Sequence, residues 1–318
     1  MGNPTAASSD HPDNSSEVAA TTAGPLAANR RIVHALSFEI EDWFHLEGLP
    51  TSNDPSRWDA LPSLVEKYTG QILETLARHR ERATFFMLGW VCQRYPHMAA
   101  EISAAGHELA IHSFWHRRCD RLARGELYRD LKQSIDLVEQ QGGQKVLGFR
   151  APGGSITPGS EWVFDVLLDL GLKYDSSLPA AWTSPAGFRT SVGCGPFGGT
   201  PSGRTIAELP ISRQKLGPWS WAFASGPGLR LLPGRLLRRG FRQHERDGQP
   251  AVLSLHPRDF AADCPRARVP WPWRFKHHTG LKTTQKKLES LISRYRFDTC
   301  AAVLGLQAAQ RERGSRAA

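Results

Sequence analysis

The sequence predicts an α/β fold, a distorted (β/α)7-type barrel of parallel strands. Short apolar runs alternate along the chain with segments of helical spacing, and short connections join them. Such alternation is typical of parallel strands covered by helices. About seven such units fit into about 270 residues, and this favours a closed or partly closed barrel over an open sheet.

The expected elements begin near residue 30. A buried strand over 32–38 ends in carboxylates, and helical spacing follows over Pro62–Arg80. The next elements alternate in the same way: strand 83–88, helix Pro96–Ala105 before Gly106, strand 107–112, helix Leu127–Gln141 before two glycines, strand 146–150 and helix Trp162–Leu170.

The second half of the chain is less regular. Residues 180–201 are rich in Gly, Pro and Ser and are expected to form a long loop. A strand is expected over 251–255, an amphipathic helix over Lys282–Tyr295 and a last short strand near 296–303. We expect one domain over 30–305, with a disordered leader at 1–29 and a disordered tail at 306–318.

Composition and charge narrow the classes of function. The five cysteines form no C-x-x-C pair, so neither a zinc ribbon nor a disulfide framework is indicated. No apolar run reaches the length of about 18 residues that suggests a membrane-spanning helix. The N-terminus lacks the layout of a secretory signal. These features favour a reducing compartment and a cytoplasmic location.

The net charge is +9, and much of the excess of basic over acidic residues lies in the arginine-rich segment Leu229–Arg246. It is interpreted either as the solvated face of a helix or as a surface for acidic membrane lipids or an anionic polysaccharide. Peripheral association with the inner face of the cell membrane therefore stays open. Nucleic acid is not an expected partner, because no reading motif accompanies the charge.

Carboxylates follow the first expected strand, at the end of the strands where active sites of parallel barrels lie. Glu39, Glu41 and Asp42 repel one another there, and a bound divalent cation would relieve the repulsion. The alternative is a solvated acidic turn. Because side chains alternate along a strand, Glu39 and Glu41 share one face, which favours Glu41 as a metal ligand. Asp42 is the alternative ligand if a bulge reverses the order.

Two histidines follow the third expected strand, in the segment His112-Ser113-Phe114-Trp115-His116. Histidines at i and i+4 face the same way if the strand gives way to a helical turn. Two imidazoles and one carboxylate are a common catalytic zinc set. We therefore expect His112, His116 and Glu41 to hold one divalent metal ion, with Zn²⁺ the expected ion. The alternative is two unrelated histidines among the 12 in the chain.

Two further strand ends carry one polar side chain each. Arg150 makes forked hydrogen bonds that suit the orientation of a carboxylate, and it begins a tight loop with Pro152 and two glycines. His256 stands at the tip of the strand over 251–255, where it could serve as a proton donor. Taken alone, the first segment indicates a turn and the second a structural histidine.

Together these segments resemble the motifs of the polysaccharide deacetylase (NodB-homology, carbohydrate esterase 4) family. The matching segments are Ser37–Asp42, His112–His116, Arg150–Pro152, Tyr174–Ser177 and Leu255-His256, the last with its frame shifted by one. The chain is similar in particular to the subgroup associated with bacterial exopolysaccharide and exosortase gene clusters. That subgroup carries a C-terminal extension of the DUF3473 type, which here would begin at about residue 260.

The resemblance implies a metal-dependent hydrolase that removes N-acetyl groups from a polysaccharide or its lipid-linked precursor. It implies a metal at Glu41, His112 and His116 that would polarise the acetyl carbonyl and acidify water. Glu39 would then take the proton of the water, and His256 would protonate the leaving amine. A NodB-homology barrel is the implied fold.

Further roles also follow from the resemblance. Arg150 would hold Glu39, and Asp175 would tune His256 or shape the pocket. The side chains expected to contact sugar are Trp43, Trp115, Pro152 and Trp182.

Glu39 departs from the family, which usually has Asp at the base position. One extra methylene moves the carboxylate by about 1 Å, and a misplacement of that size can cost about 100-fold in rate. Two alternatives therefore stay open. One is a catalytically impaired glycan-binding member of the same fold, and the other is an amidase that acts on a small cyclic amide or ureide.

Overall fold

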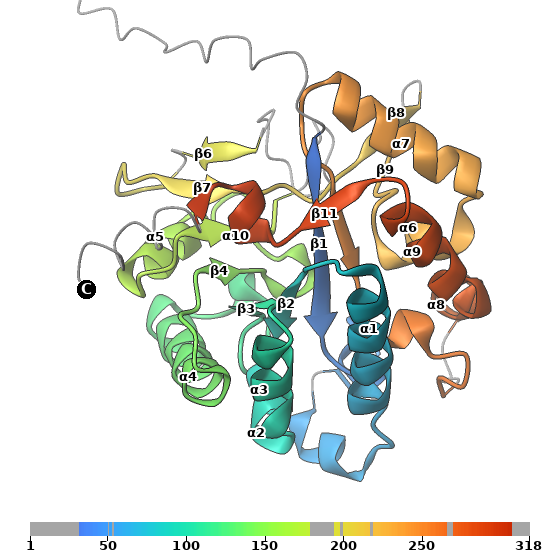
Figure 1. Ribbon diagram of the computed structural model, residues 1–318. Coiled ribbons are helices and arrows are strands. Elements are labelled where there is room, and N and C mark those ends of the chain that lie inside the picture. Colours follow the sequence, from blue (N-terminus) through green and yellow to red (C-terminus); the bar gives the residue numbers. More distant parts are fainter. Residues whose placement is uncertain are drawn as a thin grey trace, which may run out of the picture. The chain divides into compact units, whose positions relative to one another are not determined.

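A curled sheet of mainly parallel strands, covered by helices, lies at the centre of the fold (Figure 1). The computed structural model describes residues 32–49, 51–52, 54–178, 194–197, 200–216, 219–265 and 270–306. The strand order is β10-β1-β2-β3-β4-β5-β7-β6, and β11 also pairs with β1. All of these pairs are parallel except β6 with β7. Within the described ranges no pairing joins β6 to β10, so the barrel is partly closed.

The strands of the sheet are short. Their bounds are β1 Val33–Ile40, β2 Thr84–Met87, β3 Glu108–Ile111, β4 Gly148–Phe149, β5 Tyr174–Asp175, β6 Gly195–Phe197, β7 Ile206–Glu208, β10 Val252–Leu255 and β11 Arg296–Asp298. A separate antiparallel pair consists of β8 Gln214–Leu216 and β9 Trp219–Trp221. Every residue of β2, β3 and β10 is buried, as expected for parallel strands that are covered on both faces.

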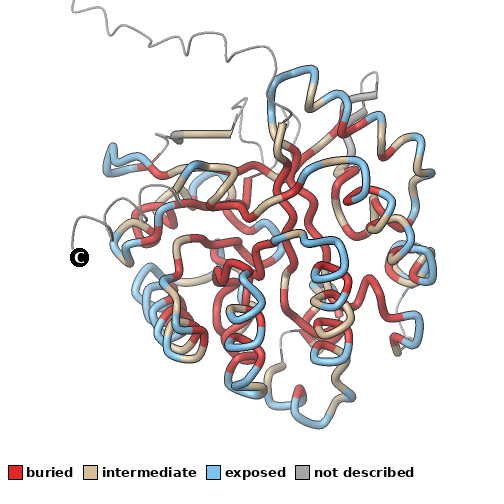
Figure 2. The backbone as a smooth tube through the Cα atoms, viewed as in Figure 1, coloured by how far each residue is buried: buried red, intermediate tan, exposed pale blue. Residues whose placement is uncertain are grey.

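Helices follow the strands and cover the sheet. The α-helices are α1 Val65–His79, α2 Gly89–Arg94, α3 His97–Ala104, α4 Arg124–Gly142, α5 Trp162–Asp169, α6 Gly226–Leu231, α7 Gly234–Arg246, α8 Trp271–His278, α9 Thr284–Ile292 and α10 Cys300–Val303. The 3-10 helices are η1 Trp43–His45, η2 Pro55–Ala60, η3 Cys119–Arg121, η4 Pro152–Gly154, η5 Pro257–Phe260 and η6 Leu281–Thr283. Buried residues follow the strands and the inner sides of the helices (Figure 2). None of the helices in the described part of the chain is both long and apolar enough to cross a membrane.

The predicted class of fold is confirmed. Some differences lie at the ends of predicted elements, and other elements, among them α2, α6, α8, β5 and β7 to β9, were not predicted. Helix α4 begins three residues before the predicted Leu127, because Glu126 accepts a hydrogen bond from the backbone N–H of Ala123 and so caps the first turn. The strand expected near 296–303 ends at Asp298. There the hydroxyl of Thr299 accepts from Ala302 N and starts helix α10.

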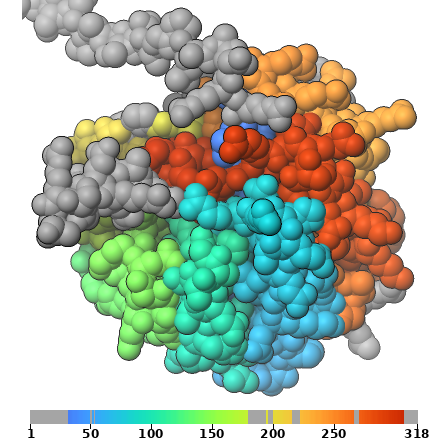
Figure 3. Space-filling view, viewed as in Figure 1, coloured from blue at the N-terminus to red at the C-terminus, as the bar shows by residue number. Residues whose placement is uncertain are grey.

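The C-terminal segment completes the sheet beside the first strand. Strand β11 pairs with the beginning of β1, and Figure 3 shows this red segment against the cyan N-terminal helix. Two ion pairs, Arg78–Glu289 and Arg82–Asp298, join the same regions. Most of the loop expected over 180–201, together with residues 1–29 and 307–318, lies outside the described residues.

Candidate active site

The polar strand ends meet at one edge of the sheet. Glu39 and Glu41 lie at the end of β1, His112 and His116 follow β3, and His256 follows β10. Because β10, β1, β2 and β3 are parallel neighbours, their carboxyl ends point the same way. The alternation of β1 turns Glu39 and Glu41 to one side, as predicted, and each carboxylate lies 3.4 Å from His256 Nε2.

Three of these side chains form a group with the donors of a metal site. Ligand atoms of Glu41, His112 and His116 lie within 4.8 Å of one another, and His116 Nε2 is 2.6 Å from Glu41 Oε2. His112 Nδ1 donates to the carbonyl of Arg150 at 2.8 Å, so its lone pair lies on Nε2. That Nε2 atom is buried without a hydrogen-bond partner. An orphaned imidazole nitrogen beside a carboxylate and a second imidazole fits a divalent cation.

The charge states of His112 and Glu41 also suit metal binding. Burial lowers the pKa of His112 to about 4, so its ring is neutral near pH 7, the state in which imidazole is a ligand. For Glu41, burial acts to raise the pKa, but His116 and the other histidines outweigh it and hold the pKa at about 2. The carboxylate is therefore ionised.

The loop between the two histidines is not the predicted helical turn. Ser113 and His116 adopt left-handed backbone conformations, with φ of 63° and 53°. The carboxylate of Asp130 on α4 accepts from Phe114 N at 2.7 Å and secures the loop. The two imidazole rings still lie close together, with centroids 5.1 Å apart, so the expected proximity arises from a different local structure.

Glu39 is fixed by an arginine and a serine. Its Oε1 accepts from Arg150 Nη1 at 3.2 Å and from the hydroxyl of Ser254, while Oε2 lies 3.6 Å from His112 Nε2. Burial acts to raise the pKa of Glu39, but His256, Arg150 and His112 together hold it well below its usual range. The carboxylate is thus ionised and faces the group of metal donors, as a proton acceptor must.

Arg150 is almost completely buried, and all of its nitrogens have partners. Besides Glu39, it donates to the hydroxyls of Ser37, Ser254 and Ser176 and to the carbonyl of Ser176. Its guanidinium lies 4.1 Å from the centre of the Phe86 ring. The expected contact with Glu39 is present, whereas the four serine contacts, which depend on strand order, were not predicted.

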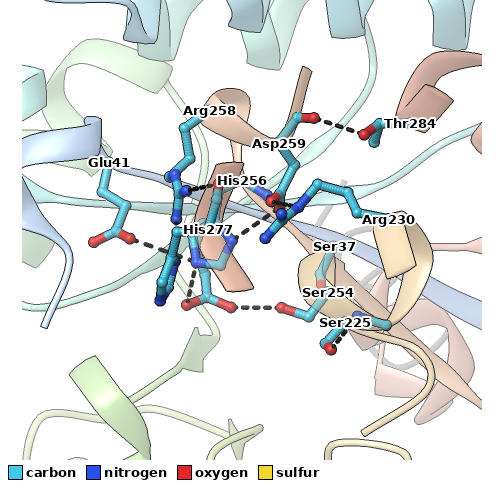
Figure 4. Close-up of polar contacts among 12 residues, drawn as sticks. Ser37, Glu41, Ser225, Arg230, Ser254, His256, Arg258, Asp259, His277 and Thr284 are labelled. Carbon is cyan, nitrogen blue, oxygen red and sulfur yellow. Dashed lines mark hydrogen bonds and ion pairs between the residues drawn. The ribbon is translucent and has the colours of Figure 1, made fainter. Parts of the chain in front are cut away.

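The structure places Asp259, and not Asp175, against His256. Asp259 Oδ2 lies 3.3 Å from His256 Nδ1 (Figure 4). Asp175 lies on β5, four strands away from β1, where it accepts from the backbone and the hydroxyl of Ser177. The expectation that Asp175 tunes His256 is therefore wrong. A local signal did exist for Asp259, since Pro257 starts a helical turn whose third residue is acidic, a capping pattern.

Asp42, the alternative metal ligand, is a helix cap. Its carboxylate accepts from the backbone N–H groups of Trp43, Leu64 and Val65 and from the hydroxyl of Ser63. These contacts turn it away from the histidines and toward the start of α1, so the alternative assignment is wrong.

Replacement of Asp42 by alanine is expected to lower the free energy of unfolding by about 2 kcal/mol, because several amide groups at helix starts lose their acceptor. The metal content of the purified protein should not change. Urea unfolding and elemental analysis measure the two quantities. Asp54→Ala is the control, since the carboxylate of Asp54 accepts an exposed hydrogen bond from Ser56 and does not cap its helix. Loss of metal from folded Asp42→Ala protein would contradict the assignment as a cap.

The four residues expected to contact sugar do not lie together around one pocket in the described part of the chain. Pro152 and His116 line a pocket of about 220 Å³ together with Glu47, Gly48, Ser52, Arg118, Arg121 and Gly153. Trp43 is instead part of the core, with 8% of its surface exposed and its indole N–H bonded to the carbonyl of Pro62. Trp115 is partly buried and packs against Trp58. Trp182 lies outside the described residues.

Asp175 forms a buried pair with Glu208 on the neighbouring strand β7. The two residues are in register, their carboxyl groups interact, and Glu208 Oε2 has no other partner. Burial raises the pKa of both groups, with mutual repulsion adding to the rise for Glu208. Two buried carboxyl groups in contact hold one proton between them, which Arg150 nearby does not displace.

This pair predicts a dependence of stability on pH. Above about pH 4 the unfolded chain releases a proton that the folded pair keeps, so the free energy of unfolding falls as pH rises, by up to about 1.4 kcal/mol per pH unit. In Glu208→Gln the amide replaces the protonated carboxyl, and this loss of stability should disappear. Urea unfolding between pH 4 and the raised pKa measures the difference, with exposed Glu101→Gln as control. Parallel curves for wild type and Glu208→Gln would refute the shared proton.

Comparisons with known proteins find two family models along the chain. A family model described as polysaccharide deacetylase matches residues 57–174, and one described as a domain of unknown function (DUF3473) matches residues 176–305. A peptidoglycan-N-acetylglucosamine deacetylase of Bacillus cereus is 29% identical over 107 residues, which are 34% of this chain and 39% of that protein. A chitooligosaccharide deacetylase of Rhizobium leguminosarum bv. trifolii is 34% identical over 70 residues, 22% of this chain and 33% of that protein.

These matches cover less than two thirds of each relative. A crystal structure from Mycobacterium smegmatis, provisionally assigned as a polysaccharide deacetylase, covers 92% of this chain and 93% of its own, with a TM-score of 0.56 and 17% identity. At that identity the likeness concerns the fold. The two family models follow each other along the chain, so that it carries a polysaccharide deacetylase region at residues 57–174 and a DUF3473 region at residues 176–305.

Proposed function

We propose that the protein is a metal-dependent hydrolase that removes N-acetyl groups from a polysaccharide or its lipid-linked precursor. The observation that carries the proposal is the position of Glu39 and His256 beside the donors Glu41, His112 and His116. The names of the matched relatives, which are deacetylases of peptidoglycan and of chitooligosaccharides, support an N-acetylated glycan as substrate. Exopolysaccharide biosynthesis is the proposed setting, and Zn²⁺ is the proposed ion.

The chemistry divides between the cation and the residues of the chain. A divalent cation held by Glu41, His112 and His116 would polarise the acetyl carbonyl and lower the pKa of water. Glu39 then accepts the proton of the attacking water, because its ionised Oε2 faces the site while Oε1 is held by Arg150 and Ser254.

His256 serves as the proton donor to the leaving amine. Its Nε2 lies between the carboxylates of Glu39 and Glu41, which favour the charged ring. Burial acts to lower the pKa of His256, but Glu39 and Asp259 outweigh it and raise the pKa well above its ordinary value. The protonated ring can therefore give a proton at neutral pH.

Acetate release tests the proposal. Full-length protein is stripped with a chelator, reloaded with Zn²⁺ and incubated with N-acetylglucosamine oligomers, peptidoglycan and acetylated exopolysaccharide. We expect acetate from at least one glycan with the reloaded protein and none with the stripped protein. Absence of acetate from every glycan with metal-loaded protein would overturn the proposal.

A glycan-binding protein of low activity is the second candidate. Glu39 in place of the usual Asp favours it, because the carboxylate reaches further into the site. Binding of the same glycans without acetate release would support this candidate. Hydrolysis of small cyclic amides or ureides, with no reaction on glycans, would instead indicate an amidase.

A further inference from the structure

His256 is held at both its ring and its backbone by one carboxylate. Asp259 Oδ2 accepts from His256 N at 3.0 Å and lies 3.3 Å from His256 Nδ1. A carboxylate beside Nδ1 places the hydrogen on that nitrogen. The proton that the charged ring can give up is then the one on the opposite nitrogen, Nε2, which faces Glu39 and Glu41 at 3.4 Å. The ring is thus oriented for proton transfer at Nε2.

Asp259 is in turn held by a buried arginine. Arg230 Nε donates to Asp259 Oδ1 at 2.9 Å, and both side chains are almost fully buried. The Nη1 atom of Arg230 donates to the carbonyls of Lys276 and Thr279, each at 2.9 Å. Figure 4 shows Arg230 beside Asp259. The arginine therefore connects the partner of the histidine to the C-terminal end of helix α8.

Neighbouring residues hold Asp259 and the short helix η5 in place. A Cβ at Gly226 would lie 2.1 Å from Asp259 Oδ2, so that only glycine at the start of α6 leaves room for the carboxylate. Thr284 at the start of α9 donates to the carbonyl of Asp259 at 2.7 Å. The next arginine, Arg258, binds the ring and the carbonyl of His277 on α8. Elements α6, α8 and α9 thus all contact the short helix η5.

We propose that Asp259 and Arg230 are positioning residues that fix the tautomer and the orientation of His256. Both lie in residues 176–305, so the DUF3473 region supplies part of the catalytic apparatus. Asp175 is unavailable for this role because it is paired with Glu208 and Ser177. The role of His256 as proton donor rests on the proposed function, whereas its tautomer does not.

The test replaces Asp259 by asparagine, which keeps the size of the side chain. Both oxygens of Asp259 accept hydrogen bonds, Oδ1 from Arg230 and Oδ2 from His256, whereas asparagine has only one oxygen, so one of these contacts is lost. We expect kcat for acetate release to fall by about 100-fold or more, the range of general acid catalysis, with KM and metal content within about twofold of wild type. Asp263→Asn is the control, since Asp263 lies only four residues after Asp259 in the sequence and its exposed carboxylate pairs with Lys67.

Nitrogen NMR gives a readout that does not require activity. Spectra of ¹⁵N-histidine protein, recorded at a pH at which the His256 ring is neutral and with His256→Ala to assign the signal, should show hydrogen on Nδ1 of His256 in wild type and a changed pattern in Asp259→Asn. If wild type releases no acetate, the proposed function fails and the spectra alone decide the present proposal. If Asp259→Asn does not fold, Arg230→Lys, which loses the two bonds to α8, should change kcat in the same direction.

Two results would overturn the proposal. One is an unchanged His256 signal in Asp259→Asn together with kcat near wild type. The other is a loss of activity that comes from lost metal or raised KM with the tautomer retained, because the carboxylate would then only support the fold.

Discussion

Replacement of His112 by alanine is expected to remove the divalent cation from the purified protein and to abolish hydrolysis. The orphaned Nε2 of His112 is one of three donors, and its loss leaves Glu41 and His116 as an incomplete set. Elemental analysis should find about one ion per wild-type chain and almost none in the variant. Addition of Zn²⁺ should raise the melting temperature of wild type alone, because a ligand that binds only the folded state stabilises it.

His97→Ala is the matched control for this experiment. His97 lies on the surface at the start of α3 and contacts Glu66. Its removal should change neither the metal content nor the rate of hydrolysis. Equal metal content in wild type and His112→Ala would refute the proposed metal centre, whatever the activity.

Replacement of Glu39 by glutamine is expected to lower kcat by about 1,000-fold while one ion per chain is retained, since removal of a general base costs about 100- to 10,000-fold. The amide oxygen can still accept from Arg150 and Ser254, so the side chain keeps its position. What it loses is the ability to take a proton. Steady-state kinetics and elemental analysis of the same preparation measure both quantities, and activity near that of wild type would exclude Glu39 as the base.

Glu39→Asp separates an efficient enzyme from an impaired one. In this chain Arg150 and Ser254 bind the carboxylate at the distance from the backbone that a glutamate side chain spans. Shortening the side chain draws the carboxylate back by about 1 Å, which should lower the rate by about 100-fold. A sharp rise in rate would instead mean that Glu39 is a poor substitute for Asp and that the chain is an impaired member of the family.

Local sequence patterns predicted the part of the site that depends on local geometry. Alternation along β1 placed Glu39 and Glu41 on one side, and apolar runs located the strand ends that carry His112 and His256. Such patterns contain no information about strand order. The resemblance therefore assigned Asp175 to His256, whereas the carboxyl of Asp175 interacts with Ser177 and Glu208. Asp259, which the sequence analysis did not single out, lies beside His256.

Tryptophan positions show a similar limit. An indole has a large apolar surface and one polar N–H, so the same residue type suits a sugar-binding surface and a core with one hydrogen bond. Trp43 belongs to the second kind, and only its contact with Pro62, 19 residues away in the sequence, distinguishes the two.

The left-handed backbone at Ser113 and His116 has a consequence for how this protein can change. A non-glycine residue in that conformation costs about 1 kcal/mol or more, which the rest of the fold must offset. The cost is accepted at the segment that sets the direction of a metal-ligating ring. Mutations that relax this loop would raise the stability of the protein, but they would hold the metal-ligating ring less firmly in position. Under selection for stability alone, such mutations would be favoured, and the geometry of the metal site would be lost while the fold is kept.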